Sequence, residues 1–323
     1  MSAQSLTPAA AAPVVSGERA AFLIMAGILI VLPFVPVIGY PFFLMQALCF
    51  ALFACAFNLL VGYVGLLSFG HAMFMGWASY VCAHAAKVWG LPIELSLLAG
   101  VAAASAVGLV AGLLAIRRQG IYFSMITLAL AQMIYFLCLQ APFTHGEDGI
   151  QGVPQGKLLG LISLSNQLTL YYVVLGIFLC AFLFMHRIVN SPFGEILKAI
   201  RENEPRAISL GYKTDRYKLT AFVLSAALAG LAGSLKAIAS QTASLTDVHW
   251  SMSGEVVLMT LLGGMGTIFG PVLGAFIIAG MQNFLSGFGQ WVLVIQGVIF
   301  VICVLAFRRG IIGELGGWLK KSL

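Results

Sequence analysis

The chain has 323 residues, of which 61% are apolar and only 9% are charged, and its mean hydropathy is +1.01. A soluble domain carries roughly 25% charged residues, so this composition excludes an ordinary water-soluble protein and indicates an integral membrane protein. The net charge of +6 does not indicate nucleic acid binding, because Lys and Arg lie in clusters between apolar segments and do not cover one face.

The chain begins with a stretch that has no hydrophobic periodicity. Residues 1–19 are rich in Ala, Pro and Ser, which predicts a disordered tail. Ala20–Ile38 follows and is long enough to span a bilayer. A cleavable signal peptide is the competing interpretation, but the preceding stretch is nearly uncharged and no convincing Ala-x-Ala site follows. We expect an uncleaved membrane anchor.

Nine more apolar segments follow along the chain. They are Pro41–Val61, Leu66–Ala86, Pro92–Ile116, Ile121–Gln140, Leu168–His186, Leu219–Ser240, Gly254–Phe269, Pro271–Leu285 and Gln290–Phe307. If both termini are cytoplasmic, ten spans place every basic cluster on one face of the membrane, as the positive-inside rule requires. We therefore predict an all-α, multi-pass membrane domain of about ten transmembrane helices over residues 20–310, with cytoplasmic tails at residues 1–19 and 311–323.

The loops between these spans carry most of the polar residues. Ala141–Gln167 and Gln241–Ser253 fall on the outer side, and Lys236, near the outer end of its span, is expected to snorkel toward water. Residues 190–218 form the long cytoplasmic loop, and Ser191–Leu219 contains six of the Lys and Arg residues of the chain. Charged cytoplasmic loops are common in membrane proteins, so charge alone does not assign this loop a function.

The sequence of this loop predicts two short helices. The first has an apolar stripe at helical spacing that suits packing against the membrane domain, formed by Phe193, Ile196, Leu197 and Ile200. Ser191 and Pro192 fit its N-cap and first position. Asn203 can begin the second helix, which Gly211 can end in a left-handed conformation. We expect Glu204 and Arg206 to point outward.

Two glycine-rich segments, Gly62–His71 and Gly263–Pro271, resemble each other when one gap is allowed. Paired glycine interruptions indicate two pseudo-repeated halves with broken helices around a central path. Close helix contacts through small residues give a similar pattern, so both interpretations stay open.

Several polar residues lie inside the apolar segments. Ser68 and His71 need hydrogen-bond partners there, either as links between helices or as lining of a path. Their spacing of three places them on one helical face, but a serine without a third orienting group is a poor nucleophile. The other such residues are Asn58, Thr127, Gln132, Glu255, Gln282, Asn283 and Gln296. Glu255 lies close to the outer face, and the spans hold no deeper carboxylate, which argues against proton-driven transport.

No motif for chemistry or cofactor binding is present. The sequence has no GxxxxGK[ST] loop, and its six cysteines lie in apolar segments without a CxxC pair. We expect no catalytic, cofactor-binding or metal-binding residues in this chain.

The cytoplasmic loop contains four short runs, Pro192-Phe193-Gly194, Ala199 to Glu204, Leu210-Gly211 and Arg216-Tyr217-Lys218. In these runs it resembles the loop of LivM-type permeases, the membrane subunits of branched-chain amino acid ABC importers. The resemblance implies that this loop contacts ATP-hydrolysing subunits. The residues that it implies for this coupling are Glu195, Arg201, Glu202, Asn203, Glu204, Arg206 and Gly211.

Both glycine-rich segments are similar to motifs of the same family. The first supplies Gly65, Ser68, Phe69, Gly70 and His71, and the second supplies Gly263, Gly264, Gly266, Thr267, Gly270 and Pro271. The resemblance implies that they belong to the translocation path, to which we add the intramembrane polar residues Asn58, Thr127 and Gln132.

The resemblance also implies the other members of the assembly. They are a second, LivH-like permease, two ATP-binding subunits (LivG-like and LivF-like) that bind ATP and Mg, and a periplasmic substrate-binding protein, in and around the lipid of a bacterial inner membrane. The expected substrates are branched-chain or related amino acids. The alternatives are amides or aromatic acids, an ATP-independent secondary transporter, and a membrane enzyme.

Overall fold

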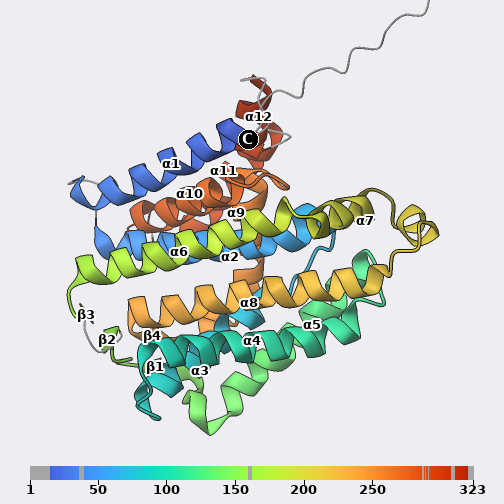
Figure 1. The fold of residues 1–323 in the computed structure, drawn as a ribbon. Coiled ribbons are helices and arrows are strands. Elements are labelled where there is room, and N and C mark those ends of the chain that lie inside the picture. Colours follow the sequence, from blue (N-terminus) through green and yellow to red (C-terminus); the bar gives the residue numbers. More distant parts are fainter. Residues whose placement is uncertain are drawn as a thin grey trace, which may run out of the picture.

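A computed structural model of the chain describes residues 15–35, 40–158, 162–285, 287, 289, 291–306 and 310–318. Its helices are α1 (Val15–Val31), α2 (Pro41–Asn58), α3 (His71–Lys87), α4 (Ile93–Ala115), α5 (Ile121–Gln140), α6 (Gln167–Val189), α7 (Pro192–Ser209), α8 (Thr214–Ser240), α9 (Trp250–Gly263), α10 (Gly270–Leu285), α11 (Trp291–Ala306) and α12 (Gly310–Trp318). Its strands are β1 (Ile150–Gln151), β2 (Lys157–Leu158), β3 (Ile162–Ser163) and β4 (Thr242–Ala243). The long helices lie side by side, with α7 at one end of the bundle and the strands at the other (Figure 1). We call these ends the α7 end and the strand end.

The predicted order of helices is confirmed. Each of the ten predicted apolar segments overlaps one α-helix, from α1 to α6 and from α8 to α11. Five described helices are long and apolar enough to cross a membrane: Pro41–Val64, Ile93–Ala115, Ile121–Gln140, Gln167–Val189 and Thr214–Ser240. Shorter apolar helices cover Arg19–Phe34, Gly270–Leu285 and Val294–Cys303. The structure thus supports a multi-pass helical membrane protein, while the count of ten spans stays a prediction.

The helix α2 forms the centre of the bundle. Every residue from Ala47 to Asn58 is buried, and the helix packs against α6, α8, α9 and α10. A helix that is apolar on all sides is stable only when it is covered on all sides. Beyond Asn58 it continues as a π-helical turn, Leu59–Val64.

Small residues allow α3, α4 and α8 to approach closely. A Cβ added at Gly100 of α4 would lie 2.1 Å from Ser234 Oγ of α8, and one added at Gly233 would lie 1.9 Å from the carbonyl oxygen of Met75 of α3. Such contacts are typical of membrane helices, which gain little from excluding water and associate through close van der Waals contact.

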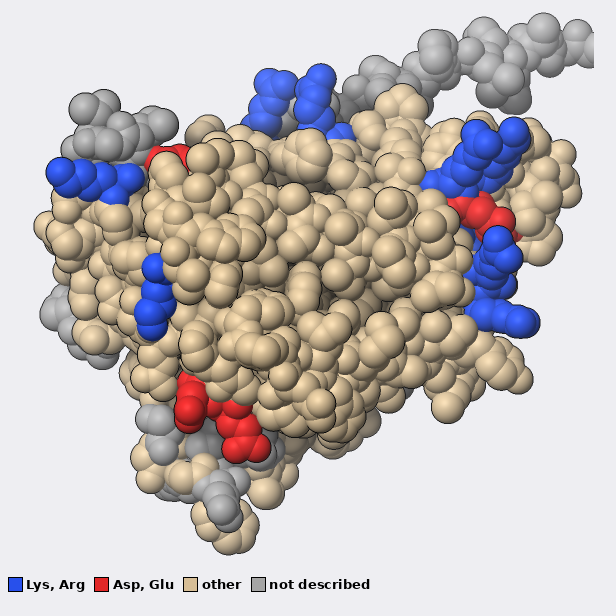
Figure 2. Space-filling view, turned by 90° about the horizontal axis from the view of Figure 1, so that it is seen from below, with Lys and Arg blue, Asp and Glu red and all other residues tan. Residues whose placement is uncertain are grey.

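The outer surface has the character of a lipid-facing surface. Exposed side chains on α4 include Leu98, Val110 and Leu114. On the face shown in Figure 2, charged side chains lie toward the edges and the broad middle consists almost entirely of uncharged residues. This distribution agrees with the high cost of placing charge in hydrocarbon.

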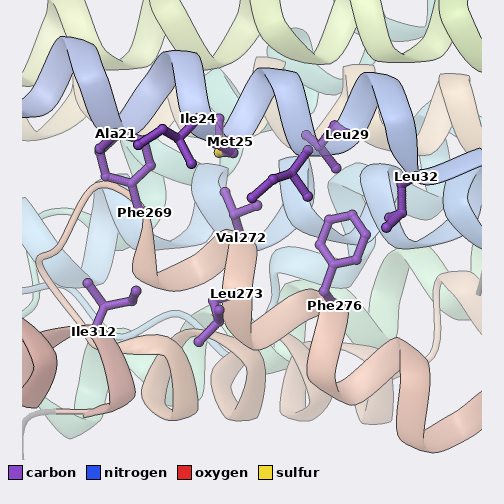
Figure 3. A pocket seen from close by; sticks show the side chains of 11 residues that line it. Ala21, Ile24, Met25, Leu29, Leu32, Phe269, Val272, Leu273, Phe276 and Ile312 are labelled. Carbon is purple, nitrogen blue, oxygen red and sulfur yellow. The ribbon is translucent and has the colours of Figure 1, made fainter. Parts of the chain in front are cut away.

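The helix α1 is attached through α6. The hydroxyl group of Tyr171 donates a hydrogen bond to the carbonyl oxygen of Leu29 at 2.6 Å, and Phe22 stacks on Phe182 with ring centroids 6.0 Å apart. Between α1 and α10 a groove of about 410 Å³ remains, to which α12 contributes one residue (Figure 3). Among the described residues, eleven line the groove, and all of them are apolar, so none of these side chains could bind a charged group.

At the strand end, two outer loops are joined. Strand β1 pairs antiparallel with β4, and the amide of Val153 donates to the carbonyl oxygen of Gln241 at 3.0 Å. These strands are two residues long and lie in loops outside the long helices, so the predicted all-α class holds. Between β4 and α9, Asp247 is buried and forms an ion pair with Lys236 of α8. The expectation that Lys236 snorkels to water is therefore wrong, because its ammonium group has a buried carboxylate to pair with.

Several predicted boundaries differ from the structure. Helix α8 begins at Thr214, inside the predicted loop, and α9 ends at Gly263, before the predicted Phe269. The span predicted to begin at Leu66 begins at His71, because Gly65 adopts φ +82° and the chain then runs as a loop to Gly70. Helix α1 begins at Val15, inside the stretch predicted as a tail, and α12 lies in the stretch predicted as the C-terminal tail. Residues 1–14 and 319–323 of these predicted tails lie outside the described residues.

Candidate functional site

The helix α7 is built from local signals that its sequence carries. The Ser191 side chain caps it by accepting a hydrogen bond from the amide of Gly194, and Pro192 occupies the first turn. On the apolar stripe, Leu197 and Ile200 are buried. Phe193 lies beside Tyr217 of α8, with ring centroids 5.8 Å apart. The predicted apolar face of α7 therefore packs against the membrane domain.

The predicted division of this loop into two helices is confirmed as a kink. Asn203 has non-helical torsion angles (φ −157°, ψ 91°) within α7. Its side-chain oxygen accepts a hydrogen bond from the amide of Arg206 at 3.1 Å, which caps the second segment. Gly211 follows the end of α7 with φ +90°, a conformation that glycine adopts at little cost.

The charged residues of α7 do not all point the same way. Glu202 and Arg206 are exposed, and Glu195 forms an exposed ion pair with Lys198 at 2.8 Å. Glu204 instead pairs with Lys218 of α8 at 2.5 Å, with side chains only 15% and 3% exposed, and accepts a hydrogen bond from Gln119 at 2.7 Å. The expectation that Glu204 points outward is wrong, because the kink at Asn203 turns it toward α8.

Arg201 connects α7 to the first glycine-rich segment. Its Nη1 donates a hydrogen bond to the carbonyl oxygen of Gly62 in the π-helical turn. The aliphatic part of the same side chain lies over Gly65, where an added Cβ would be 3.1 Å from Arg201 Cγ. A glycine at position 65 thus allows both the left-handed backbone conformation and the close approach of α7.

Asn58, the last residue of α2, joins the two glycine-rich segments. Its Nδ2 donates to the carbonyl oxygen of Thr267 at 2.8 Å, and its Oδ1 accepts from the amide of Gly266 at 2.9 Å. The Gly62 backbone lies so near that an added Cβ would be 2.8 Å from the nitrogen of Gly266. We call residues 58–65 and 263–271 together the glycine junction. Segments about 200 residues apart in sequence meet here, directly beneath α7.

The second glycine-rich turn is stabilised by hydrogen bonds of the Thr267 side chain within the turn. Thr267 Oγ1 donates to the carbonyl oxygen of Gly264 at 2.8 Å and accepts from the amide of Gly270 at 3.1 Å. Gly263 has no room for a side chain, since a Cβ would lie 1.9 Å from the carbonyl oxygen of Gly270. Pro271 is buried in the first turn of α10, so the structure brings all six predicted residues of this segment together.

The remaining predicted path residues form a second group around the start of α3. Gly70 lies against α5, where an added Cβ would be 2.2 Å from the carbonyl oxygen of Thr127. The hydroxyl of Ser68 accepts a hydrogen bond from the amide of Gly70 at 3.3 Å. Ser68 lies in the loop before α3 and not on a helical face with His71, so the geometry considered for a hydrolase is wrong.

His71 is fully buried and its partner is Ser225 of α8. The distance between His71 Nε2 and Ser225 Oγ is 2.8 Å. Ser225 also donates to the carbonyl oxygen of Ala56 at 2.5 Å, and since a serine has one proton, His71 Nε2 must be the donor in their contact. The ring lies among phenylalanines, with Phe57 and Phe74 at centroid distances of 5.2 and 5.4 Å. In this structure His71 therefore links α3 to α8.

Phe69 differs from its neighbours because its side chain is exposed. Together with Gly65 it lines a cavity of about 470 Å³ between the first glycine-rich loop and the start of α5. The other lining residues are Leu66, Leu67, Gly120, Ile121, Phe123, Ser124, Met125 and Leu128. Gln132 is half-buried on α5 and does not line this cavity.

The sequence analysis missed several residues of this region. Ser225 is a polar residue inside an apolar span, a signal that could have placed it with Asn58 and Thr127. Ser253 accepts a hydrogen bond from the amide of Ala72 in the first turn of α3 at 2.9 Å. Lys218 belongs to the Arg216-Tyr217-Lys218 run, but its contact with Glu204 and that of Gln119 could not be predicted, because both depend on the kink that turns Glu204 toward them.

Among the described residues, no group of three or more His, Cys, Asp or Glu side chains could hold a metal ion. The six cysteines are free thiols.

Comparison with known proteins gives a consistent family. The family model described as "Branched-chain amino acid transport system / permease component" matches residues 40–305. The permease proteins LivM of Salmonella typhimurium strain LT2 and of Escherichia coli strain K12 are each 29% identical over 279 residues, which is 79% of this chain and 65% of theirs. The chain thus spans less than two thirds of the length of these relatives.

More distant relatives transport other substrates. The ribose import permease protein RbsC of Bacillus subtilis strain 168 is 30% identical over 196 residues, covering 56% of this chain and 58% of that protein. No solved structure matches the chain. The match of the family model over most of the chain, with the helices and glycine-rich segments in order, shows that the chain belongs to the family of branched-chain amino acid transport permease components.

Proposed function

We propose that the chain is a membrane-spanning subunit of an ATP-driven ABC importer that moves branched-chain or related amino acids into the cytoplasm by alternating access. The observation that carries this proposal is the position of α7, a charged surface helix that packs on the bundle and hydrogen bonds to the glycine junction. A helix placed in this way can receive a displacement from a partner and pass it to the helices below.

The outward charges of α7 would face the partner ATPases. Glu195, Glu202 and Arg206 are exposed around the helix, and complementary charges at such a surface favour one docking orientation. ATP and Mg would be held by two ATP-binding subunits, LivG-like and LivF-like. A second, LivH-like permease would supply the other half of the membrane core, and a periplasmic binding protein would deliver substrate at the strand end. In this arrangement residues 190–218 and both termini lie in the cytoplasm of a bacterium, and the helices cross its inner membrane.

We propose that the translocation path runs beside the first glycine-rich loop and α5. The cavity there is lined mainly by apolar side chains, which suits the side chain of a branched-chain amino acid. The two LivM relatives support this substrate class. The ribose permease relative favours testing a sugar as well, and amides and aromatic acids complete the set of alternatives.

Reconstitution tests the energy source. The chain would be placed in proteoliposomes with candidate partner permease, ATPases and binding protein, and uptake of radiolabelled leucine, ribose, an amide and an aromatic acid would be measured with and without ATP. We expect leucine uptake only with ATP and with all partners. Uptake by liposomes that contain this chain alone would instead support a secondary transporter and refute the proposal.

A charge reversal tests the docking surface. Glu202→Lys with Arg206→Glu reverses two exposed charges, and we expect it to weaken ATPase binding while the protein still inserts. Glu204 is unsuitable for this purpose, because Glu204→Lys would place two ammonium groups together at Lys218. The matched control is Glu147→Lys at the strand end, where the side chain is also exposed. Unchanged ATPase binding in the double variant would contradict the assignment.

A further inference from the structure

Arg201 is exposed over part of its surface, like Glu202 and Arg206, but its side chain also reaches the membrane domain below α7. Its Nη1 hydrogen bonds to the carbonyl oxygen of Gly62. The same nitrogen would be 3.2 Å from a Cβ added at Gly266, and Cγ would be 3.1 Å from one added at Gly65. The side chain therefore contacts the first glycine-rich turn and closely approaches the second.

The acceptor is suited to a guanidinium group. Gly62 lies in the π-helical turn that continues α2. The carbonyl groups in the last turn of a helix have no amide partner within the helix. The C-terminal end of a helix also carries partial negative charge, which a cation stabilises. Arginine holds its charge and presents several N–H groups in a rigid plane.

The turn that receives Arg201 is itself joined to the second glycine-rich turn. Asn58 hydrogen bonds to both Gly266 and Thr267, so a force on the π-helical turn is passed to the loop between α9 and α10. Helix α7 also packs directly against the π-helical turn, as it does against α6 and α8. Arg201 adds to this packing a hydrogen bond to the backbone of the turn.

We propose that Arg201 is a positioning residue of the permease, which ties α7 to the glycine junction so that a displacement of α7 moves both glycine-rich turns. This inference rests on the proposed function and deepens it. It gives Arg201, which the resemblance places among the residues that contact the ATPase, a contact with the side that receives the motion, while Glu202 and Arg206 remain at the partner surface.

The test measures substrate taken up per ATP hydrolysed in the reconstituted complex. In Arg201→Leu, ATPase subunits still dock and hydrolyse ATP, and we expect the ratio to fall by about tenfold or more, the factor that corresponds to losing one charge-assisted hydrogen bond. Arg201→Lys keeps the charge without the planar group, and we expect a fall of about two- to threefold. The matched control is Arg216→Leu, an exposed arginine at the same end of the bundle, which is expected to keep the native ratio.

Two results would overturn this inference. One is a native ratio in Arg201→Leu. The other is a parallel loss of hydrolysis and uptake that leaves the ratio unchanged, because that is what a merely structural role predicts. If Arg201→Leu does not insert into the membrane, the inference is tested with Arg201→Lys. A native ratio of uptake to ATP hydrolysis in that variant refutes the proposed role of Arg201. Failure of the native complex to couple ATP to uptake would refute the proposed function itself, which is a different outcome.

Discussion

Breaking the buried ion pair at the strand end is expected to destabilise the protein strongly. The side chains of Lys236 and Asp247 are only 12% and 3% exposed, and Lys236 Nζ also lies 5.1 Å from the centre of the Phe50 ring. Removing one member of such a pair leaves a buried charge without compensation, which costs about 3–5 kcal/mol. Lys236→Met, which keeps most of the side-chain volume, is therefore expected to lower the free energy of unfolding by about that amount.

Replacing both residues separates the cost of an unpaired buried charge from the contribution of the ion pair to the free energy of unfolding. In Lys236→Met with Asp247→Leu no charge remains buried, and we expect most of the lost stability to return. The matched control is the exposed pair of α7, Lys198 and Glu195, with side chains 37% and 67% exposed. Lys198→Met is expected to cost less than about 0.5 kcal/mol.

The assay is denaturant unfolding of the purified variants in mixed detergent micelles. The reasoning is refuted if Lys236→Met is as stable as the native chain, since the site would then be wet enough to solvate a lone carboxylate. It is also refuted if the double variant is as unstable as the single one, because the loss would then come from shape and not from charge.

Three further substitutions, one of them with a control at Gly211, test the glycine junction and its surroundings. Gly65→Ala is expected to cost about 1–2 kcal/mol from its positive φ alone, and more because the added methyl group must displace Arg201. Gly211 also has a positive φ but has open space around it, so Gly211→Ala measures the torsional cost alone. Equal losses of unfolding free energy in Gly65→Ala and Gly211→Ala would contradict the contact between Gly65 and Arg201. Asn58→Leu removes two hydrogen bonds between the turns and is expected to cost about 2 kcal/mol or more, with increased hydrogen exchange at the second turn as the measurement. Ser225→Ala leaves the buried histidine at the start of α3 without an acceptor, and a loss of about 1–3 kcal/mol is expected on unfolding.

Much of the fold could be predicted because its signals are local. Long apolar segments separated by glycine, proline and charge define helices regardless of what surrounds them. The ends and kink of α7 follow from single residues, Ser191, Asn203 and Gly211, whose own torsion angles and side chains make the structure.

The contacts of the candidate site could not be predicted in the same way, because their partners are distant in sequence. Arg201 and Gly62 are 139 residues apart, and Lys236 finds a carboxylate in a segment that reads as an external loop. The glycine-rich motifs did identify the right segments. That they meet at one end of the bundle depends on how α2, α9 and α10 pack.

The two apolar spaces bear on how a substrate could be selected. Of the described residues that line the groove between α1 and α10 and the cavity beside Phe69, none is charged. An amino acid carries an ammonium and a carboxylate group, and burying either without compensation costs several kcal/mol.

Under the proposed function, the groups that hold these charges must therefore come from backbone, water or the partner permease, while this chain contributes an apolar wall. Such a wall distinguishes side chains by only about 1–3 kcal/mol per methylene group. The same scaffold can then accept different substrates with little change, which is consistent with relatives named for amino acids and for ribose, and strong selection is left to the protein that delivers the substrate.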